Sequence, residues 1–239
     1  MKLTTVLFDL DGTLLPMDQD TFVKGYFSLL AKKIAPLGYE PETLFKALWA
    51  GVAAMVKNDG SCVNEDAFWK TFCGFYGEKA LAHKPYFDEF YRNEFQQVQG
   101  CCGYDARAAQ VVALLKEKGY RLALATNPLF PAAATLSRIR WAGLCADDFE
   151  LVTTYDNSTC CKPNPAYYRE VMGKLGVAPQ ECLMIGNDVT EDMMTRELGM
   201  QVYLLTPCLI NKAGRDLSDY PQGGFDELLA LVHALPDAR

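Results

Sequence analysis

Residues 6–15 read Val6-Leu7-Phe8-Asp9-Leu10-Asp11-Gly12-Thr13-Leu14-Leu15. The first part of this run is apolar and predicts a buried strand that ends at Asp9. Asp11 follows two positions later, and Gly12 and Thr13 then end the strand. Ligands bind at the carboxyl ends of strands in open α/β sheets, and paired carboxylates there suit Mg²⁺ or separate nucleophile and acid–base roles. A polar turn after a strand would have the same sequence, so the rest of the chain decides between the two interpretations.

The composition is that of an ordinary globular protein. Of the 239 residues, 50% are hydrophobic and 22% are charged. No apolar run reaches the roughly 20 residues of a membrane span, so no membrane partner is expected. The formal net charge of −7 argues against a nucleic-acid polymer as the main partner. A small phosphorylated molecule is compatible with this charge, because local cations and a metal ion can reverse the field inside a cleft.

The nine cysteines bear on location and on metal binding. Their odd number predicts a reduced, cytoplasmic protein, and residues 1–5 leave no room for a secretory signal before the first strand. Zinc is not expected, since no two cysteines have the Cys-x-x-Cys spacing. The two histidines, His83 and His233, also lie far in sequence from the adjacent pairs Cys101-Cys102 and Cys160-Cys161.

The composition and the apolar spacing of the chain change after the first strand. Between residues 17 and 100 it is rich in aromatic residues and leucine, with apolar residues at helical spacing. This spacing predicts helices at residues 21–35, 41–57, 64–76 and 85–97. Successive helices without a strand between them favour a small helical bundle.

From residue 104 onward, short apolar strands alternate with helices. After the strand at 3–9, strands are predicted at 121–125, 149–153, 183–185 and 202–205, and helices at 106–118, 130–142, 166–175, 191–198 and 226–235. This alternation is typical of βαβ units and predicts an α/β fold with a Rossmann-like parallel sheet. Because the first strand precedes the bundle, we expect a discontinuous core domain, residues 1–16 and 101–239, that carries an inserted helical domain, residues 17–100.

Polar side chains follow four of the predicted strands, and the carboxyl ends of parallel strands meet at one edge of a sheet. In chain order they are Asp9 and Asp11, Thr126 and Asn127, Lys162, and Asp188 and Asp192. Each alone has an ordinary explanation as a turn signal, a solvated lysine or a helix cap. Together they fit phosphoryl transfer, in which Asp9 would attack phosphorus while Mg²⁺ neutralises charge. Thr126, Asn127 and Lys162 would bind the phosphate oxygens.

The same segments resemble the haloacid dehalogenase-like hydrolases. The run from Asp9 to Leu14 is similar to the family's first motif, Asp-x-Asp-Gly-Thr, and the later segments are similar to its second, third and fourth motifs in the same order: Thr126, Lys162 and Gly186-Asn187-Asp188 through Asp192. The resemblance implies that Asp9 is the phosphorylated nucleophile. It also implies that Asp11 is the general acid–base and binds Mg²⁺ through its backbone carbonyl, that Thr126 and Lys162 bind the phosphoryl group, and that Asp188 binds the metal.

One position departs from the family pattern. The fourth motif commonly reads Gly-Asp, whereas Asn187 follows the glycine here. The candidate metal ligands are therefore Asp9, Asp11, Asp188 and Asp192. We expect Asp188 in direct contact with the metal, and Asp192 either bound through water or orienting Lys162.

The resemblance also bears on the reaction. A dehalogenase of this family attacks carbon and usually lacks the acid two residues after the nucleophile, so Asp11 favours a phosphatase. We expect a Mg²⁺-dependent phosphomonoester hydrolase that acts on a small phosphorylated metabolite through an aspartyl-phosphate at Asp9. The helical insertion resembles the family's helical cap of the first type, and the protein would be a monomer or a weak homodimer. A phosphomutase, a phosphonatase and a non-catalytic phosphate-binding or regulatory protein are the alternatives.

Overall fold

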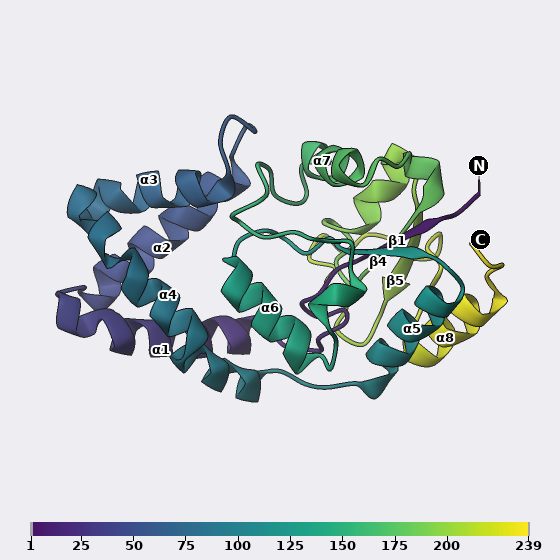
Figure 1. Ribbon diagram of the computed structural model, residues 1–239, viewed down its shortest axis with the longest axis horizontal. Helices are drawn as coiled ribbons and strands as arrows, with labels where there is room; N and C mark the ends of the chain where they lie inside the picture. The colour runs from purple at the N-terminus through teal and green to yellow at the C-terminus, as the bar shows by residue number, and fades with distance from the viewer. Residues whose placement is uncertain (1, 239) are drawn as a thin grey trace.

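The computed structural model describes residues 2–238 and has a six-stranded sheet at its centre (Figure 1). The strands pair in parallel throughout. In spatial order they are β3 (Leu151–Val152), β2 (Arg121–Leu124), β1 (Thr5–Phe8), β4 (Cys182–Gly186), β5 (Gln201–Leu205) and β6 (Gln222–Gly223). Chain order reverses at β1, between β2 and β4, and open α/β sheets bind ligands at such a reversal. The predicted Rossmann-like parallel fold is confirmed.

The central strand β1 is buried along its whole length. Its main-chain bonding continues past the strand, because the N–H of Asp9 donates to the carbonyl of Ile185 at 2.9 Å. On the other side, the N–H of Ala125 donates to the carbonyl of Phe8 at 2.7 Å. These bonds hold the loops that follow β1, β2 and β4 side by side at the carboxyl edge of the sheet.

Four helices cover the two faces of the sheet: α5 (Ala106–Glu117), α6 (Ala132–Trp141), α7 (Pro165–Leu175) and α8 (Phe225–Ala234). Val6 and Phe8 of β1 share a hydrophobic cluster with α5, α6 and α8, whereas Leu7 shares another with α7. Alternate side chains of a strand point to opposite faces, which explains this division. In Figure 1, α7 lies above the sheet and α5 and α8 lie below it.

A helical region, residues 19–101, follows β1 and extends to the left of the sheet in Figure 1. Its α-helices are α1 (Gln19–Ile34), α2 (Pro41–Val56), α3 (Asn64–Tyr76) and α4 (Lys84–Arg92). Short 3₁₀ helices join α1 to α2 and α3 to α4. The buried aromatic residues of this region belong to the same hydrophobic cluster as one face of the sheet. The rings of Phe95 and of Trp141 in α6 stack with their centroids 5.2 Å apart, so the helical region and the sheet share one core.

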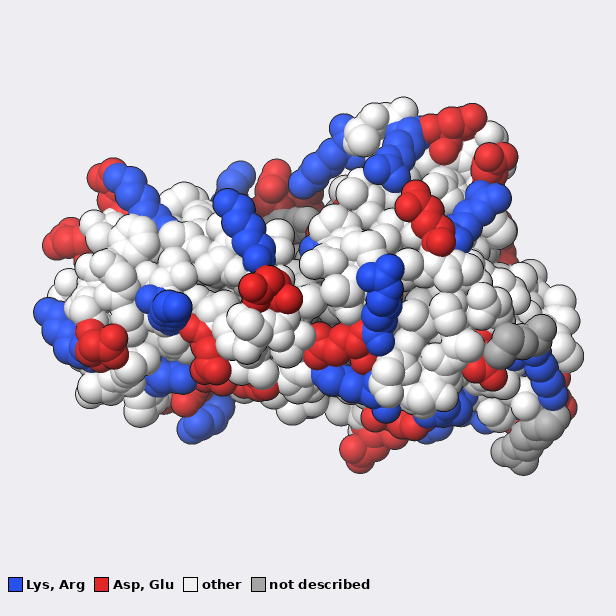
Figure 2. All heavy atoms as spheres, turned by 90° about the horizontal axis from the view of Figure 1, so that it is seen from above, with Lys and Arg blue, Asp and Glu red and all other residues white. Residues whose placement is uncertain are grey.

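Charged side chains are mixed over the face seen in Figure 2, where Lys and Arg are interspersed with Asp and Glu. This face carries no continuous basic surface of the kind that binds nucleic acid. Within residues 2–238, no helix is long and apolar enough to cross a membrane.

Two predicted helices differ in the structure. The helix expected at 85–97 ends with α4, because Asn93 has a non-helical backbone (φ −112°, ψ −83°), and a 3₁₀ helix, η3 (Glu94–Cys101), follows it. The helix expected at 191–198 is the 3₁₀ helix η6 (Met193–Leu198). There the N–H of Thr195 donates to a carbonyl three residues before it, which is the 3₁₀ pattern.

Two edge strands also differ. Main-chain bonds hold the stretch expected at 149–153 along β2, yet only the two residues of β3 have strand pairing. The equally short β6 was not predicted, because two residues, one of them glycine, carry no apolar pattern.

Replacing Phe95 with alanine should lower the free energy of unfolding by about 3–5 kcal/mol, because the change leaves a cavity between the helical region and α6. Urea denaturation followed by circular dichroism measures the loss. Phe75→Ala is the control, since Phe75 is 46% exposed. That variant should lose less than about 0.5 kcal/mol. Equal losses for the two variants would contradict a shared core.

Candidate active site

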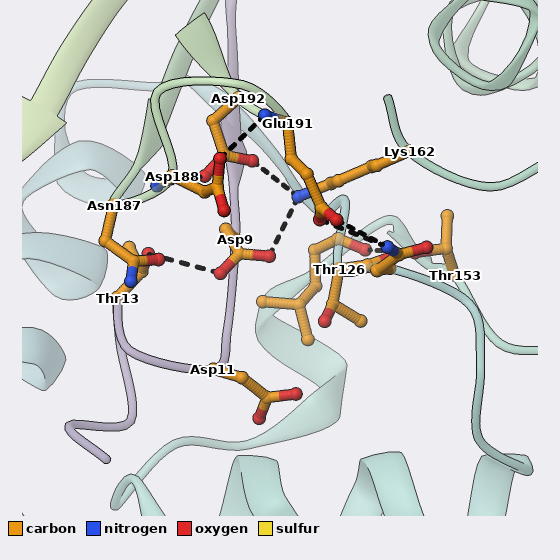
Figure 3. Close-up of polar contacts among 12 residues, drawn as sticks. Asp9, Asp11, Thr13, Thr126, Thr153, Lys162, Asn187, Asp188, Glu191 and Asp192 are labelled. Atoms are coloured by element: carbon orange, nitrogen blue, oxygen red, sulfur yellow. Dashed lines mark hydrogen bonds and ion pairs between the residues drawn. The ribbon is translucent and has the colours of Figure 1, made fainter. Parts of the chain in front are cut away.

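The loops that follow β1, β2 and β4 enclose a cavity of about 240 Å³. Six of the seven predicted site residues line it: Asp9, Asp11, Thr126, Asn127, Asp188 and Asp192. The seventh, Lys162, comes from the segment between β3 and α7, and its ammonium group contacts Asp9. The structure therefore brings all seven residues to the carboxyl edge of the sheet. Figure 3 shows Asp9, Asp11, Thr126, Lys162, Asp188 and Asp192 there.

Asp9 is only 7% exposed, and both of its carboxylate oxygens have a protein partner. Oδ1 accepts a hydrogen bond from Lys162 Nζ at 2.8 Å, and Oδ2 accepts one from the Thr13 hydroxyl at 3.2 Å. The Thr13 hydroxyl also lies 2.9 Å from Asn187 Oδ1. Gly12 has a φ of +83°, and a Cβ there would lie 2.4 Å from Asn187 Nδ2, so this turn requires glycine. Asn187, the departure from the family pattern, thus links the β4 loop to the β1 loop.

Lys162 is buried between two carboxylates. Its Nζ donates to Asp9 Oδ1 at 2.8 Å and to Asp192 Oδ1 at 2.6 Å. Burial alone would lower the pKa of Lys162, but the charges of Asp192 and Asp9 outweigh burial and hold this pKa well above its usual value. Lys162 is therefore a permanent cation beside Asp9.

The protein engages both oxygens of Asp192. Oδ1 accepts from Lys162, and Oδ2 accepts from the N–H of Asp188 at 3.0 Å. A Cβ on Gly186 would lie 2.1 Å from Asp192 Oδ2, so only glycine lets this carboxylate reach its position. Of the two roles expected for Asp192, these contacts favour orienting Lys162 over binding a metal.

The oxygen donors beside Asp9 fit Mg²⁺. Within residues 2–238, no three His, Cys, Asp or Glu side chains are placed to surround a metal ion. A metal here would therefore rely on the carboxylates of Asp9 and Asp188, the main-chain carbonyl of Asp11, and water or substrate oxygens. Mg²⁺ is commonly held by one or two carboxylates and keeps several waters, whereas zinc prefers nitrogen and sulfur ligands.

The side chain of Asp11 lies apart from the Lys162 network (Figure 3). Its Oδ2 accepts a hydrogen bond from Nη1 of Arg138, a fully buried residue of α6. Its Oδ1 is buried and has no hydrogen-bond partner in the part of the chain that the structure describes. Burial raises the pKa of Asp11, and the Arg138 guanidinium opposes this rise. Arg138 thus holds Oδ2 of Asp11, and Oδ1 is available to exchange a proton.

Arg138 was not among the residues predicted from the sequence, although its position on an apolar helix face indicates a buried charge. Ala134, Arg138 and Trp141 follow the spacing of one buried helix face. An arginine on such a face needs an anionic partner. Only the packing of α6 against the β1 loop identifies that partner as Asp11.

The loop after β2 is fixed by its main chain. The Thr126 carbonyl accepts hydrogen bonds from the hydroxyls of Thr153 at 2.7 Å and Tyr167 at 2.9 Å. Asn127 Nδ2 lies 3.1 and 3.2 Å from the two carboxylate oxygens of Glu191. Glu191 was not predicted, and burial raises its pKa. Because Glu191 holds the Asn127 amide, Thr126 is the better placed of the two to contact a phosphate.

Replacing Arg138 with methionine should lower the free energy of unfolding by about 3 kcal/mol, because Asp11 loses its buried cation. Denaturation in guanidinium chloride measures the loss. Adding Asp11→Asn should recover most of it, and the double-mutant cycle reports the coupling free energy. Purely additive losses would show that the ion pair does not hold Asp11.

A family model described as haloacid dehalogenase-like hydrolase matches residues 3–199. Phosphoglycolate phosphatase of Nitrosococcus oceani is 30% identical over 128 residues, which cover 53% of this chain and 55% of that protein. Pyrophosphatase PpaX of Bacillus velezensis is 23% identical, and the match covers 97% of this chain and 96% of that protein. The chain spans about half the length of the first curated relatives that it matches.

Solved structures of the same fold include a 2-haloacid dehalogenase from Pseudomonas syringae, with a TM-score of 0.62 and 19% identity over 97% of this chain and 98% of that chain. A HAD phosphatase from Thermococcus onnurineus has a TM-score of 0.59 and 20% identity, over 99% of this chain and 100% of that chain. At these identities the likeness shows the fold alone. The family model, however, covers most of the chain, including the loops that hold Asp9, Thr126, Lys162 and Asp192. As its motifs predicted, the chain belongs to the haloacid dehalogenase-like hydrolases.

Proposed function

We propose that the protein is a Mg²⁺-dependent phosphomonoester hydrolase whose nucleophile is Asp9. The observation that carries this proposal is the contact between the Asp9 carboxylate and the buried Lys162 ammonium, at a cavity that Thr126 also lines. A cation fixed beside the nucleophile attracts the phosphoryl oxygens and so favours attack on phosphorus. The names of three relatives, a phosphoglycolate phosphatase, a probable phosphatase and a pyrophosphatase, support the same class of reaction.

The reaction would take two steps. An Asp9 oxygen attacks phosphorus, the bond from phosphorus to the leaving oxygen breaks, and protonated Asp11 gives its proton to that oxygen. Asp11 then takes a proton from water, the water oxygen attacks phosphorus, and the bond between Asp9 and phosphorus breaks. Thr126 and Lys162 hold the phosphoryl oxygens in both steps. Mg²⁺, bound by Asp9, Asp188 and the Asp11 carbonyl, would neutralise phosphoryl charge.

The contacts of Asp11 support this role. Arg138 holds Oδ2, and Oδ1 has no partner within residues 2–238. A proton can therefore reside on Oδ1 while Oδ2 keeps its hydrogen bond to Arg138.

The other reactions of the fold have different requirements. A phosphonatase would need a lysine of the helical region to form an imine with its substrate, and no described lysine of that region lines the cavity. A phosphomutase would use the same residues but return the phosphoryl group to the substrate. Release of inorganic phosphate therefore separates a phosphatase from a mutase.

We further propose that residues 17–100 form a cap over a core made of residues 1–16 and 101–239. Gln19, Phe22 and Trp49 of the helical region line the same cavity as Asp9. Side chains of the cap would therefore contact the leaving group.

Replacing Asp9 with asparagine should lower kcat for phosphate release from a panel of phosphomonoesters by at least about 10³-fold, because the amide is a poor nucleophile. A colorimetric phosphate assay measures the rate. Asp59→Asn, the same change in an exposed loop, should leave the rate within about twofold. Full activity of Asp9→Asn would contradict the proposal.

Removing divalent ions with EDTA should abolish phosphate release, because the phosphoryl charge would lack its metal counterion. Adding Mg²⁺ in excess of the chelator should restore the rate, and the same titration on Asp188→Asn should require more Mg²⁺. Undiminished turnover in EDTA would show that the reaction needs no metal.

A further inference from the structure

A second cavity, of about 120 Å³, lies between the helical region and the loop after β2. It adjoins the catalytic cavity, because four residues line both: Val23, Trp49, Leu129 and Phe130. The remaining wall is mainly aromatic and aliphatic, with Leu48 and Val52 from α2 and Phe68 and Trp69 from α3. A group attached to a phosphate at Asp9 would therefore lie next to this apolar chamber.

Neither cavity offers a cation to a second anionic group. Among the described residues, no lysine, arginine or histidine lines either cavity. Apart from Lys162, which contacts Asp9, two cations lie against aromatic rings of the wall: Arg138 lies 4.5 Å from the Phe130 ring, and Lys84 lies 5.1 Å from the Trp69 ring. Both are already paired, Arg138 with Asp11 and Lys84 with a glutamate. A carboxylate or a second phosphate on the leaving group would lose its hydration without gaining a partner.

Of the three tyrosine hydroxyls in the wall, two are paired with each other, whereas the buried Trp69 Nε1 has no hydrogen-bond partner among the described residues. The Tyr26 and Tyr91 hydroxyls lie 2.8 Å apart and bond to each other. Apart from the Trp69 indole N–H, the wall offers mainly apolar surface, which favours an apolar group over the several hydroxyl groups of a sugar. Its volume is somewhat below the roughly 150 Å³ of an engineered apolar cavity that binds benzene, which limits the occupant to one small ring or a short chain.

We propose that the substrate is a phosphomonoester whose leaving group is uncharged and apolar, either a short alkyl chain or a single aromatic ring. This inference rests on the proposed phosphatase function and specifies its substrate class. It separates this chain from relatives named for phosphoglycolate and pyrophosphate, since both of those substrates carry a second anionic group.

An alkyl phosphate series tests the inference, because the leaving alcohols differ little in acidity. For ethyl, butyl and hexyl phosphate, kcat/KM should rise by about fourfold per methylene, equivalent to about 0.8 kcal/mol each. Phosphoglycolate, which has the length of ethyl phosphate and a carboxylate, should be hydrolysed less well than ethyl phosphate. A flat series, or phosphoglycolate as the best substrate, would overturn the inference while phosphate release would still support the proposed function.

A matched pair of variants on α2 locates the effect. Val52 lines the second cavity, whereas Val56, one turn later, is 40% exposed and does not line it. Val52→Phe fills the chamber and should flatten the dependence of kcat/KM on chain length, and Val56→Phe should keep the wild-type dependence. The ratio of hexyl to ethyl phosphate within one variant is independent of the fraction of folded enzyme. An unchanged ratio in Val52→Phe would place the alkyl chain elsewhere.

Binding to the Asp9→Asn variant separates the two proposals. Trp49 and Trp69 line the chamber, so tryptophan fluorescence should report alkyl phosphate binding, with Kd falling about fourfold per methylene. If no ester releases phosphate from the wild-type protein, the proposed phosphatase function fails. The Kd values of the alkyl phosphates for the Asp9→Asn variant then decide by themselves whether the chamber binds an apolar group. A Kd that does not change with chain length would overturn the apolar leaving group.

Discussion

The ammonium group of Lys162 lies 2.8 Å from Asp9 and 2.6 Å from Asp192, and all three side chains are largely removed from water. Two carboxylates buried together would repel each other, and one would take up a proton. The lysine ammonium lies between the two carboxylates and offsets their repulsion, and Asp192 keeps the lysine in place. Because the three groups come from the loops after β1, β3 and β4, the ion triad depends on the strand order of the sheet.

A second ion pair joins Arg138 to Asp11, whose side chain lies apart from the Lys162 network (Figure 3). Arg138 holds Asp11 from α6, on the side of the sheet that the helical region also covers. The two aspartates of one short turn thus have separate cations and separate surroundings, which suits one to attack and the other to exchange protons. Phe130 lines the apolar chamber, and the Arg138 guanidinium lies against the Phe130 ring. In the proposed reaction, the acid–base residue and the chamber for the leaving group would therefore both lie next to Phe130.

The sequence sufficed for the parts of the molecule that local rules determine. The apolar strands and the polar residues after them predicted the parallel sheet and the meeting of Asp9, Thr126 and Lys162 at one edge. It did not reveal Arg138 or Glu191, because their roles arise from contacts between distant segments. The break at Asn93 and the short edge strands depend on packing as well. The apolar chamber was not foreseen, since an aromatic residue at helical spacing looks the same in a core and in a binding site.

In the proposed reaction, Asp9 forms a covalent bond to phosphorus during turnover. Rapid mixing with a hydrolysable phosphomonoester, followed by borohydride reduction, converts an aspartyl-phosphate to homoserine, which peptide mass spectrometry locates. We expect homoserine at position 9 only when the ester is present, and none in the Asp9→Asn variant. Steady release of phosphate with Asp9 unmodified at every time of quenching would rule out an aspartyl-phosphate at Asp9.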